Sequence, residues 1–209
     1  MASKIIDFIN EIEKIYSEFS KGLLYNKNLR KIGISEILDP TQRDFEINFG
    51  RFIKKYRDNL ESTCYNLIVN EGLNYFCQDP PEVRFNTRIK IQESIMFKIW
   101  RNIEKEEKIG KITVYKTLND LIGLRIVILK DFETKILKIK EELEATGKYR
   151  IIDKNKNGYY ACHVYTQNSN KIFPLEIQIW DEKYEKSNKD SHEKYKMGYK
   201  EFLGIYKNL

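Results

Sequence analysis

A cluster of basic residues near the middle of the chain has the spacing of a polyphosphate-binding site. Arg88 and Lys90 lie two apart in a segment that alternates like a strand, so their side chains face the same way. Ser94, Lys98 and Arg101 follow at helical spacing and share one helix face. Cations, a hydroxyl and a helix N-terminus together suit the charge of a polyphosphate. A solvated basic face explains the spacing equally well.

An aspartate and an arginine accompany the most apolar segment, residues 122–129. Asp120 stands just before it, and a carboxylate fixed at a strand end suits Mg²⁺, which takes few protein ligands and keeps phosphate oxygens. Arg125 is the one charge inside the run. Because burying an unpaired charge is expensive, we expect Arg125 to reach a site or a partner. A plain cap or turn role is the alternative for Asp120.

Two later segments add aromatic and acidic side chains. Tyr159 follows a turn and suits stacking on a base, although core packing is the alternative. Glu176 and Gln178 alternate with isoleucines and face one side of a strand, where a carboxylate can accept a proton from a hydroxyl or help to hold a metal. A half-exposed strand with solvated polar groups explains this pattern too. His192 lies in a polar helix, where a solvated face is the simplest interpretation.

The elements that must position these residues follow from hydrophobic periodicity. The segment Asp39-Pro40-Thr41 breaks the chain and starts a helix that runs toward residue 69, with Gly72 favouring its end. Further helices are expected at 4–20, 92–106, 131–146 and 181–203, and strands at 82–90, 122–129, 148–153, 159–167 and 172–180. This order suits one mixed sheet flanked by helices.

Length and composition bound the kind of protein. The chain has 209 residues, a net charge of +6 and a pI of about 9.0, which fits one or two domains and polyanionic ligands such as nucleotides or RNA. We expect an N-terminal helical region at 1–78 and a compact unit at 79–209. The helices of the first region either pack on the sheet or stand partly apart.

The sequence argues against several classes of protein. No apolar run approaches a membrane span and the N-terminus lacks a signal peptide, so we expect a cytoplasmic protein without membrane contact. The three cysteines show no Cys-x-x-Cys spacing, which favours free thiols over disulfides or zinc. Neighbouring strand residues point to opposite faces, which argues against a Cys162–His163 nucleophilic pair.

The order of these motifs resembles the synthetase domain of RelA/SpoT proteins, over about residues 83–200. The matching motifs are Arg-x-Lys-x-x-x-Ser-x-x-x-Lys, Asp-Leu-x-Gly-x-Arg, Gly-Tyr-x-x-x-His, Glu-Ile-Gln-Ile and His-x-x-Tyr-Lys. The resemblance implies an α/β (α+β) fold, a nucleotidyltransferase-like mixed sheet flanked by helices with an N-terminal helical extension. It also implies transfer of the β,γ-pyrophosphate of ATP to a ribose 3′-hydroxyl with Mg²⁺.

Residue roles carry over by position in these motifs. The residues implied to bind ATP are Arg88, Lys90, Ser94, Lys98, Arg101 and Arg125. The residues implied to act in catalysis are Asp120, Glu176 and Gln178, of which Asp120 and Glu176 would bind Mg²⁺. Tyr159 would stack on the acceptor base, and the other residues implied on the acceptor side are His163, His192 and Lys196.

Three departures from the family pattern concern the acceptor. Tyr160-Ala161 stands where alarmone-making members commonly have Arg-Ser or Gln-Ser, and Trp180-Asp181 where Arg-Thr is usual. Asn155 occupies a position that is often lysine. A GDP or GTP acceptor brings several negative charges that basic groups would meet. These departures therefore argue against a guanine nucleotide as the acceptor.

The length resembles that of the small stand-alone synthetases, including a toxic toxin–antitoxin branch that modifies tRNA. We therefore predict transfer to the tRNA 3′ CCA end, which inhibits translation and implies an antitoxin protein as partner. The alternative is a small alarmone synthetase that uses ATP to make (p)ppGpp from GDP or GTP, or an adenine analogue from an adenine nucleotide. A third hypothesis is a catalytically silent binder of RNA or protein. Residues that suit tRNA contact, or a merely solvated loop, are Lys21, Lys27, Arg30 and Lys31.

Overall fold

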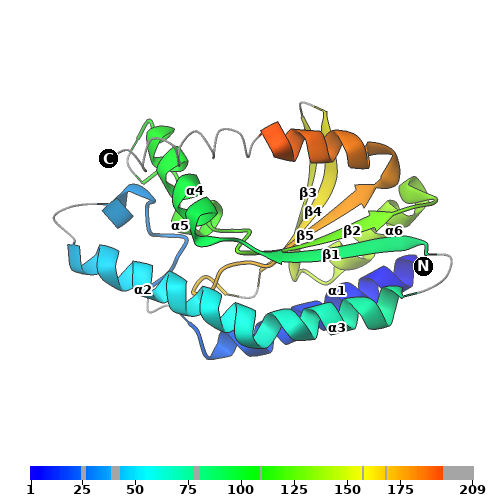
Figure 1. Ribbon diagram of the computed structural model, residues 1–209, viewed down its shortest axis with the longest axis horizontal. Helices are drawn as coiled ribbons and strands as arrows, with labels where there is room; N and C mark the ends of the chain where they lie inside the picture. Colours follow the sequence, from blue (N-terminus) through cyan, green and yellow to red (C-terminus); the bar gives the residue numbers. More distant parts are fainter. Residues whose placement is uncertain are drawn as a thin grey trace.

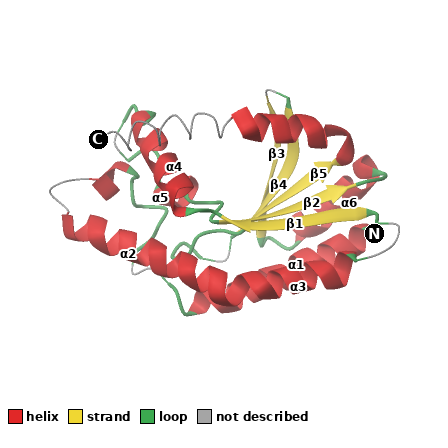
Figure 2. Ribbon diagram, viewed as in Figure 1, coloured by secondary structure: helices red, strands yellow, loops and turns green. Residues whose placement is uncertain are grey.

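A five-stranded mixed sheet forms the centre of the molecule (Figures 1 and 2). The computed structural model describes residues 1–24, 27–38, 43–77, 81–108, 110–156, 158–167 and 169–194. The strands are β1 (Val83–Ile89), β2 (Ile122–Ile128), β3 (Tyr149–Lys156), β4 (Tyr159–Thr166) and β5 (Glu176–Asp181). Their order is β1-β2-β5-β4-β3, with β2 and β5 parallel and the other neighbours antiparallel.

Helices flank this sheet, which confirms the predicted fold class. They are α1 (Ala2–Lys21), α2 (Arg43–Asn59), α3 (Tyr65–Phe76), α4 (Gln92–Glu104), α5 (Val114–Thr117) and α6 (Phe132–Ala145). Short 3₁₀ segments lie at Ser35–Leu38 and Glu182–Tyr184, and residues 185–194 are helical. The predicted helix at 181–203 extends beyond the described residues. Among the described helices, none combines the length and the apolar character that crossing a bilayer requires.

The sheet has one apolar face and one polar face, because side chains alternate along each strand. Leu124, Ile126, Ile177 and Ile179 on the apolar face are fully or almost fully buried in one core with residues of α1, α3 and α6. Phe8 of α1 packs edge-on against Phe85 of β1, with ring centroids 5.2 Å apart. The candidate functional residues lie on the opposite, polar face.

The N-terminal helices share this core. The Tyr16 hydroxyl donates to the Phe173 carbonyl oxygen over 2.8 Å and also hydrogen-bonds the Tyr56 hydroxyl. Both tyrosines are completely buried. They join α1 and α2 to the segment that leads into β5, so these N-terminal helices pack with the sheet rather than standing apart.

Gly72 does not end a helix as the sequence predicted. It lies buried inside α3, and a Cβ built at this position would come 2.2 Å from the Phe85 ring. The glycine therefore allows α3 to approach β1 closely. A π-helical segment, Leu60–Cys64, separates α2 from α3. The predicted strand at 172–180 begins only at Glu176, because Pro174 lacks the N–H that a strand interior needs.

The helix at residues 185–194 is fixed to the polar side of the sheet. Asn188 is fully buried, and its side-chain amide accepts from the Tyr160 N–H (2.7 Å) and donates to the Tyr160 carbonyl oxygen (2.8 Å). Arg84 of β1 pairs with Glu182 at 3.1 Å and with Glu185. These contacts hold the helix above the sheet (orange in Figure 1), on the side opposite α1 and α3.

Candidate active site

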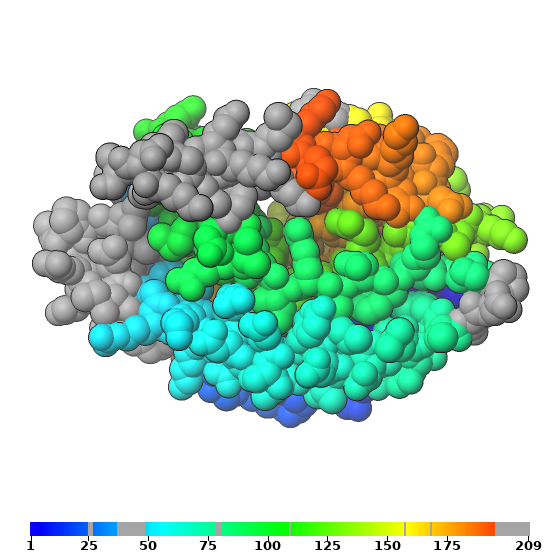
Figure 3. Space-filling view, in the orientation of Figure 1, coloured from blue at the N-terminus to red at the C-terminus, as the bar shows by residue number. Residues whose placement is uncertain are grey.

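The polar face of the sheet carries two neighbouring rows of candidate residues. Strand register places the first row across β1, β2, β5 and β4 as Asn86, Arg125, Gln178 and His163. The second row lies two residues away along each strand and consists of Arg88, Gly123, Glu176 and Tyr165. In Figure 3 residues of β1 and α4 reach the surface between α2–α3 below and the helix at 185–194 above. The fold thus gathers motifs that are far apart in the sequence.

Asp120 lies between two lysines, just before the start of β2. Its Oδ2 accepts from Lys90 Nζ at 2.6 Å and its Oδ1 from Lys98 Nζ at 2.8 Å; Lys98 also donates to Asn119 Oδ1 at 3.0 Å. Burial alone raises the pKa of Asp120, but the charges of Lys98 and Lys90 outweigh it and hold that pKa well below its usual range. Burial lowers the pKa of Lys90. The three groups form one compact charged cluster.

Glu176 is buried rather than solvated, and donors surround its carboxylate. Oε1 accepts from His163 Nδ1 (2.9 Å) and the Tyr165 hydroxyl (2.7 Å), while Oε2 accepts from Gln178 Nε2 (3.0 Å). Burial raises the pKa of Glu176, but the hydrogen bond and charge of His163 outweigh it and bring the pKa to about 2. The charge of Asp120 acts in the opposite direction, which places the two carboxylates within electrostatic reach. Glu176 is therefore ionised at neutral pH.

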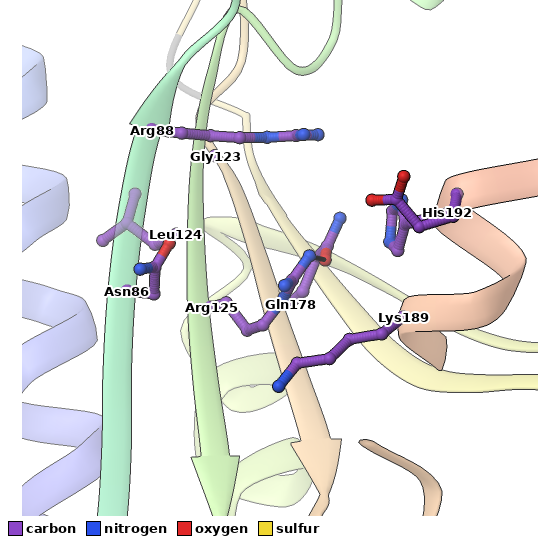
Figure 4. A pocket seen from close by; sticks show the side chains of 9 residues that line it. Asn86, Arg88, Gly123, Leu124, Arg125, Gln178, Lys189 and His192 are labelled. Carbon is purple, nitrogen blue, oxygen red and sulfur yellow. Dashed lines mark hydrogen bonds between the residues drawn. The ribbon is translucent and has the colours of Figure 1, made fainter. Parts of the chain in front are cut away.

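A cleft opens between the sheet and the helix at 185–194, and one of its lining residues is Gln178, the partner of Glu176 (Figure 4). Arg88 from β1 extends past Gly123, which has no side chain to fill the space, toward the helix that carries His192. Arg125 lines the same cleft. Burial and the charge of Arg88 lower the pKa of Arg125. Two guanidinium groups on one small cleft suit an anion or a flat ring.

Tyr159 and His192 pack against each other near this cleft. Their rings meet edge-on at 5.4 Å, and the Tyr159 hydroxyl hydrogen-bonds His163 Nε2 at 2.9 Å. Burial raises the pKa of Tyr159 to about 12. Burial, with the charges of Arg125 and Arg88, lowers the pKa of His192 to about 4, so His192 is neutral at pH 7. Stacking of Tyr159 on an acceptor base stays a prediction.

A second cavity, of about 520 Å³, adjoins the carboxylates from another side. Its four cations come from three parts of the chain, the segment around residue 30, α5 and β3, and are Arg30, Lys116, Arg150 and Lys154. The Arg30 guanidinium lies over the Tyr115 ring, 4.5 Å from its centroid. Tyr165 and Asn119 line the cavity and also contact the Glu176 and Lys98 side chains, respectively. Each of the two cavities thus has a lining residue that hydrogen-bonds Glu176, Gln178 in the first and Tyr165 in the second.

The remaining predicted residues are less closely tied to this centre. Ser94 and Arg101 are half-buried on α4, on either side of Lys98 along the helix. Lys27 and Lys31 are exposed in the segment of Arg30. Lys196 lies outside the described residues.

Sequence reasoning missed several lining residues. Tyr165 was detectable, since it lies two residues after His163 and so shares its strand face. The residues of the second cavity carried no motif, because they meet only in the fold: Tyr115, Lys116, Arg150 and Lys154.

The carboxylates present fit Mg²⁺ only with help from a substrate. Among the described residues, no group of three or more His, Cys, Asp or Glu side chains is arranged to hold a metal. Asp120 and Glu176 supply the hard oxygen ligands that Mg²⁺ prefers, and Mg²⁺ commonly completes its shell with phosphate oxygens and water. Their oxygens already accept hydrogen bonds, so metal binding must displace some of these donors.

Comparison with known proteins identifies a family. The model described as the region found in RelA / SpoT proteins matches residues 87–200, more than half of the chain. Small alarmone synthetase 1 from Bacillus subtilis is 24% identical with a TM-score of 0.45, covering 72% of this chain and 80% of that one. Small alarmone synthetase 2 from the same organism is 20% identical with a TM-score of 0.35, covering 78% of this chain and 98% of that one. The structure of small alarmone synthetase 1 from Bacillus subtilis bound to AMPCPP is 18% identical with a TM-score of 0.37, covering 78% of this chain and 99% of that one. Among curated protein sequences none matches this chain.

Proposed function

The chain belongs to the RelA/SpoT family, and on that premise we propose that it is an ATP-dependent pyrophosphokinase that transfers the β,γ-pyrophosphate of ATP to a ribose 3′-hydroxyl. The observation that carries the proposal is the convergence of Lys90 and Lys98 on Asp120, beside the ionised Glu176. This cluster combines cations for a triphosphate with carboxylates for a metal. Membership of the family by itself supports the transferase class.

The donor fits the side of the site formed by β1, α4 and the first cleft. The triphosphate would meet Lys90 and Lys98, whose ammonium groups are 2.6 and 2.8 Å from Asp120 and so lie close together. Ser94 and Arg101 on α4 extend the same helix face. The flat adenine would enter the cleft that Arg88 and Arg125 line. Each side chain then has a counterpart on ATP.

Asp120 and Glu176 would hold Mg²⁺ once the phosphates are in place. Phosphate oxygens that accept from Lys90 and Lys98 would release Asp120 from its two ammonium partners. When bound, Mg²⁺ supplies charge neutralisation on the transferring group. The lysines and the carboxylate therefore exchange partners as the donor binds.

Glu176 would orient the attacking hydroxyl more than it removes its proton. A carboxylate with a pKa of about 2 is a weak base at neutral pH. It is, however, fixed by His163, Tyr165 and Gln178, so it offers a rigid acceptor to a 3′-hydroxyl. Positioning and charge stabilisation supply most of the acceleration in phosphoryl transfer, and this arrangement suits both.

The tRNA 3′ CCA end is the acceptor that we propose first, in a toxin that inhibits translation and has a protein antitoxin. The second cavity supports it, since it adjoins Glu176 through Tyr165 and combines four cations with the Arg30–Tyr115 platform. Stacking platforms and cations are the usual means of binding single-stranded RNA. Exposed Lys27 and Lys31 beside Arg30 extend the basic surface toward a tRNA body.

A guanine nucleotide is the second candidate, favoured by one observation. The motif departures remove basic groups near Tyr159, but Arg150 and Lys154 of the second cavity bring cations close to Tyr165 and Glu176. Such cations suit the 5′-phosphates of GDP or GTP. Under this alternative the protein is a small alarmone synthetase.

A transfer assay tests the proposal and separates the candidates. The chain is incubated with γ-labelled ATP and Mg²⁺, and GDP, GTP, AMP or bulk tRNA is offered in separate reactions. Label on intact tRNA that is absent from tRNA without its CCA end supports the first acceptor, and label on GDP or GTP supports the second. If Asp120→Asn transfers as well as wild type, or no acceptor is labelled, the pyrophosphokinase proposal is wrong.

A further inference from the structure

Arg125 is backed by an aromatic ring that does not itself reach the cleft. The Arg125 guanidinium carbon lies 3.6 Å from the centroid of the Trp180 ring. Arg125 lines the cleft, whereas Trp180 is completely buried and does not line it. The indole therefore lies behind the guanidinium as seen from the cleft. One terminal nitrogen of Arg125 also donates to Gln178 Oε1 over 3.3 Å (dashed in Figure 4).

Trp180 is itself held rigidly. It stacks on His192, with ring centroids 5.8 Å apart and planes 23° apart, and Tyr159 packs edge-on at 6.0 Å. Val127, its register partner on β2, and Ala161 on β4 complete a small hydrophobic cluster around it. A ring packed on several sides offers Arg125 a fixed surface.

The way Arg125 is held leaves it ready for a ligand. In the part of the chain that the structure describes, its buried Nε meets no hydrogen-bond acceptor. Arg88 enters the same cleft from the neighbouring strand, and its charge disfavours a second cation there. A ligand that accepts hydrogen bonds could pair with Nε of Arg125, and its π face would be attracted to the two neighbouring cations.

We infer that Trp180 is the positioning residue for the donor nucleotide: its ring fixes the Arg125 guanidinium at the wall of the cleft, so that Arg125 binds ATP without first losing rotamer freedom. This inference rests on the proposed use of ATP. The sequence marks Trp180 only as a departure from the usual motif, where arginine is expected. Its stacked and fully buried place behind Arg125 gives that departure a function in donor binding.

The aromatic face of Trp180 is the property that should matter for holding Arg125. A cation over a desolvated aromatic face is held electrostatically, so a phenyl ring retains part of the effect and an aliphatic side chain retains none. An unrestrained arginine must be ordered when the ligand binds, which weakens binding. We therefore expect Trp180→Phe to bind a non-hydrolysable ATP analogue within about threefold of wild type and Trp180→Leu to bind it about tenfold more weakly.

The test compares these variants with Val127→Ala, which disturbs the same hydrophobic cluster without removing the ring behind Arg125. Analogue affinity is measured by calorimetry with Mg²⁺, and KM and kcat are measured in the transfer assay. We expect Trp180→Leu to raise KM for ATP about tenfold while KM for the acceptor stays within about twofold. We expect Val127→Ala to lower the melting temperature but to leave analogue affinity unchanged.

Intrinsic fluorescence gives an independent readout, because the chain has two tryptophans, Trp100 and Trp180. In a Trp100→Phe background, we expect the analogue to change the emission of Trp180 by altering the guanidinium that lies against its ring. The inference is overturned if Trp180→Leu binds the analogue as well as wild type, or if Val127→Ala weakens binding equally. If wild type itself does not bind the analogue, the proposed function fails instead.

Discussion

Lys90 Nζ lies 2.6 Å from Asp120 Oδ2, so a cation expected to bind phosphate is paired with the carboxylate expected to bind the metal. Lys98 completes the arrangement on the other oxygen at 2.8 Å. The pairing neutralises a site that would otherwise bury like charges without partners. The residues proposed to bind the metal and those proposed to bind the polyphosphate are therefore in direct contact before either ligand is present.

Replacing Asp120 by Asn tests whether the carboxylate is needed for chemistry. We expect transfer activity to fall at least about 100-fold, because the charge that would hold the metal is lost. We also expect the free energy of unfolding to drop by about 1–3 kcal/mol, since Lys90 and Lys98 keep their burial but lose their ion pairs. Activity is followed by label transfer and stability by urea unfolding. Growth inhibition that persists in this variant would exclude an enzymatic toxin.

Metal and nucleotide binding should be strongly coupled. Divalent metal alone must displace Lys90 and Lys98 from Asp120, whereas a polyphosphate gives both lysines new partners. We therefore expect Mn²⁺ to bind at least about tenfold more tightly in the presence of a non-hydrolysable ATP analogue, and the analogue to bind more tightly with Mn²⁺ by the same factor. Calorimetric titrations in both orders measure the coupling. In the absence of nucleotide, Lys98→Met should bind Mn²⁺ more tightly than wild type does. Unchanged or weaker Mn²⁺ binding would contradict the proposal that the lysines and Asp120 exchange partners when the donor binds.

Local patterns predicted the elements that carry one-dimensional signals. The apolar run at 122–129 and the alternation around Glu176 gave β2 and most of β5, because burial on one or both faces leaves a direct mark on residue types. The pairing of Asp120 with Lys90 and Lys98 was not predicted, although all three were chosen as site residues. Spacing places residues on faces but does not say which faces meet.

Features that depend on distant partners escaped the sequence. Gly72 resembled a helix end because its actual constraint, the Phe85 ring of β1, lies elsewhere in the chain. The polar helix at 185–194 gave no sign that Asn188 would hydrogen-bond the Tyr160 backbone in the interior. The second cavity draws on segments around Arg30, Tyr115 and Arg150, none of which forms a motif alone.

Gly72 and Gly50 form a matched pair for testing helix packing. Both lie in helices, but a Cβ at Gly72 would come 2.2 Å from the Phe85 ring, whereas no atom of the described residues lies within 4 Å of a Cβ at Gly50. We expect Gly72→Ala to destabilise the protein by about 1–3 kcal/mol through overpacking. Gly50→Ala should stabilise it by about 0.5–1 kcal/mol, since alanine favours helix. Equal effects in thermal unfolding would show that α3 does not approach β1 so closely.

His192 should remain neutral well below pH 6. Burial, Arg125 and Arg88 lower its pKa to about 4, against an ordinary value of 6.5. Because the unfolded chain takes up the proton first, His192 contributes to a loss of stability as the pH falls from about 6.5 toward 4, and the loss levels off below that. NMR titration is simple with two histidines, and His192→Gln assigns the signals. The variant should also lose this part of the pH dependence; a His192 pKa near 6.5 would contradict its burial.

Arg30 should discriminate between the two proposed acceptors. It lies over Tyr115 at the second cavity, beside exposed Lys27 and Lys31, so it can meet an RNA phosphate or base near the entrance. If tRNA is the acceptor, Arg30→Ala should lower kcat/KM for tRNA about tenfold and reduce the slope of log affinity against log salt by about 1. The KM for ATP should not change, because the ATP side of the site is unaltered. Lys54→Ala, an exposed cation on α2 paired with Asp58, is the matched control and should leave the tRNA reaction unchanged. If the control matches Arg30→Ala, tRNA is attracted by net charge alone rather than held at this cavity.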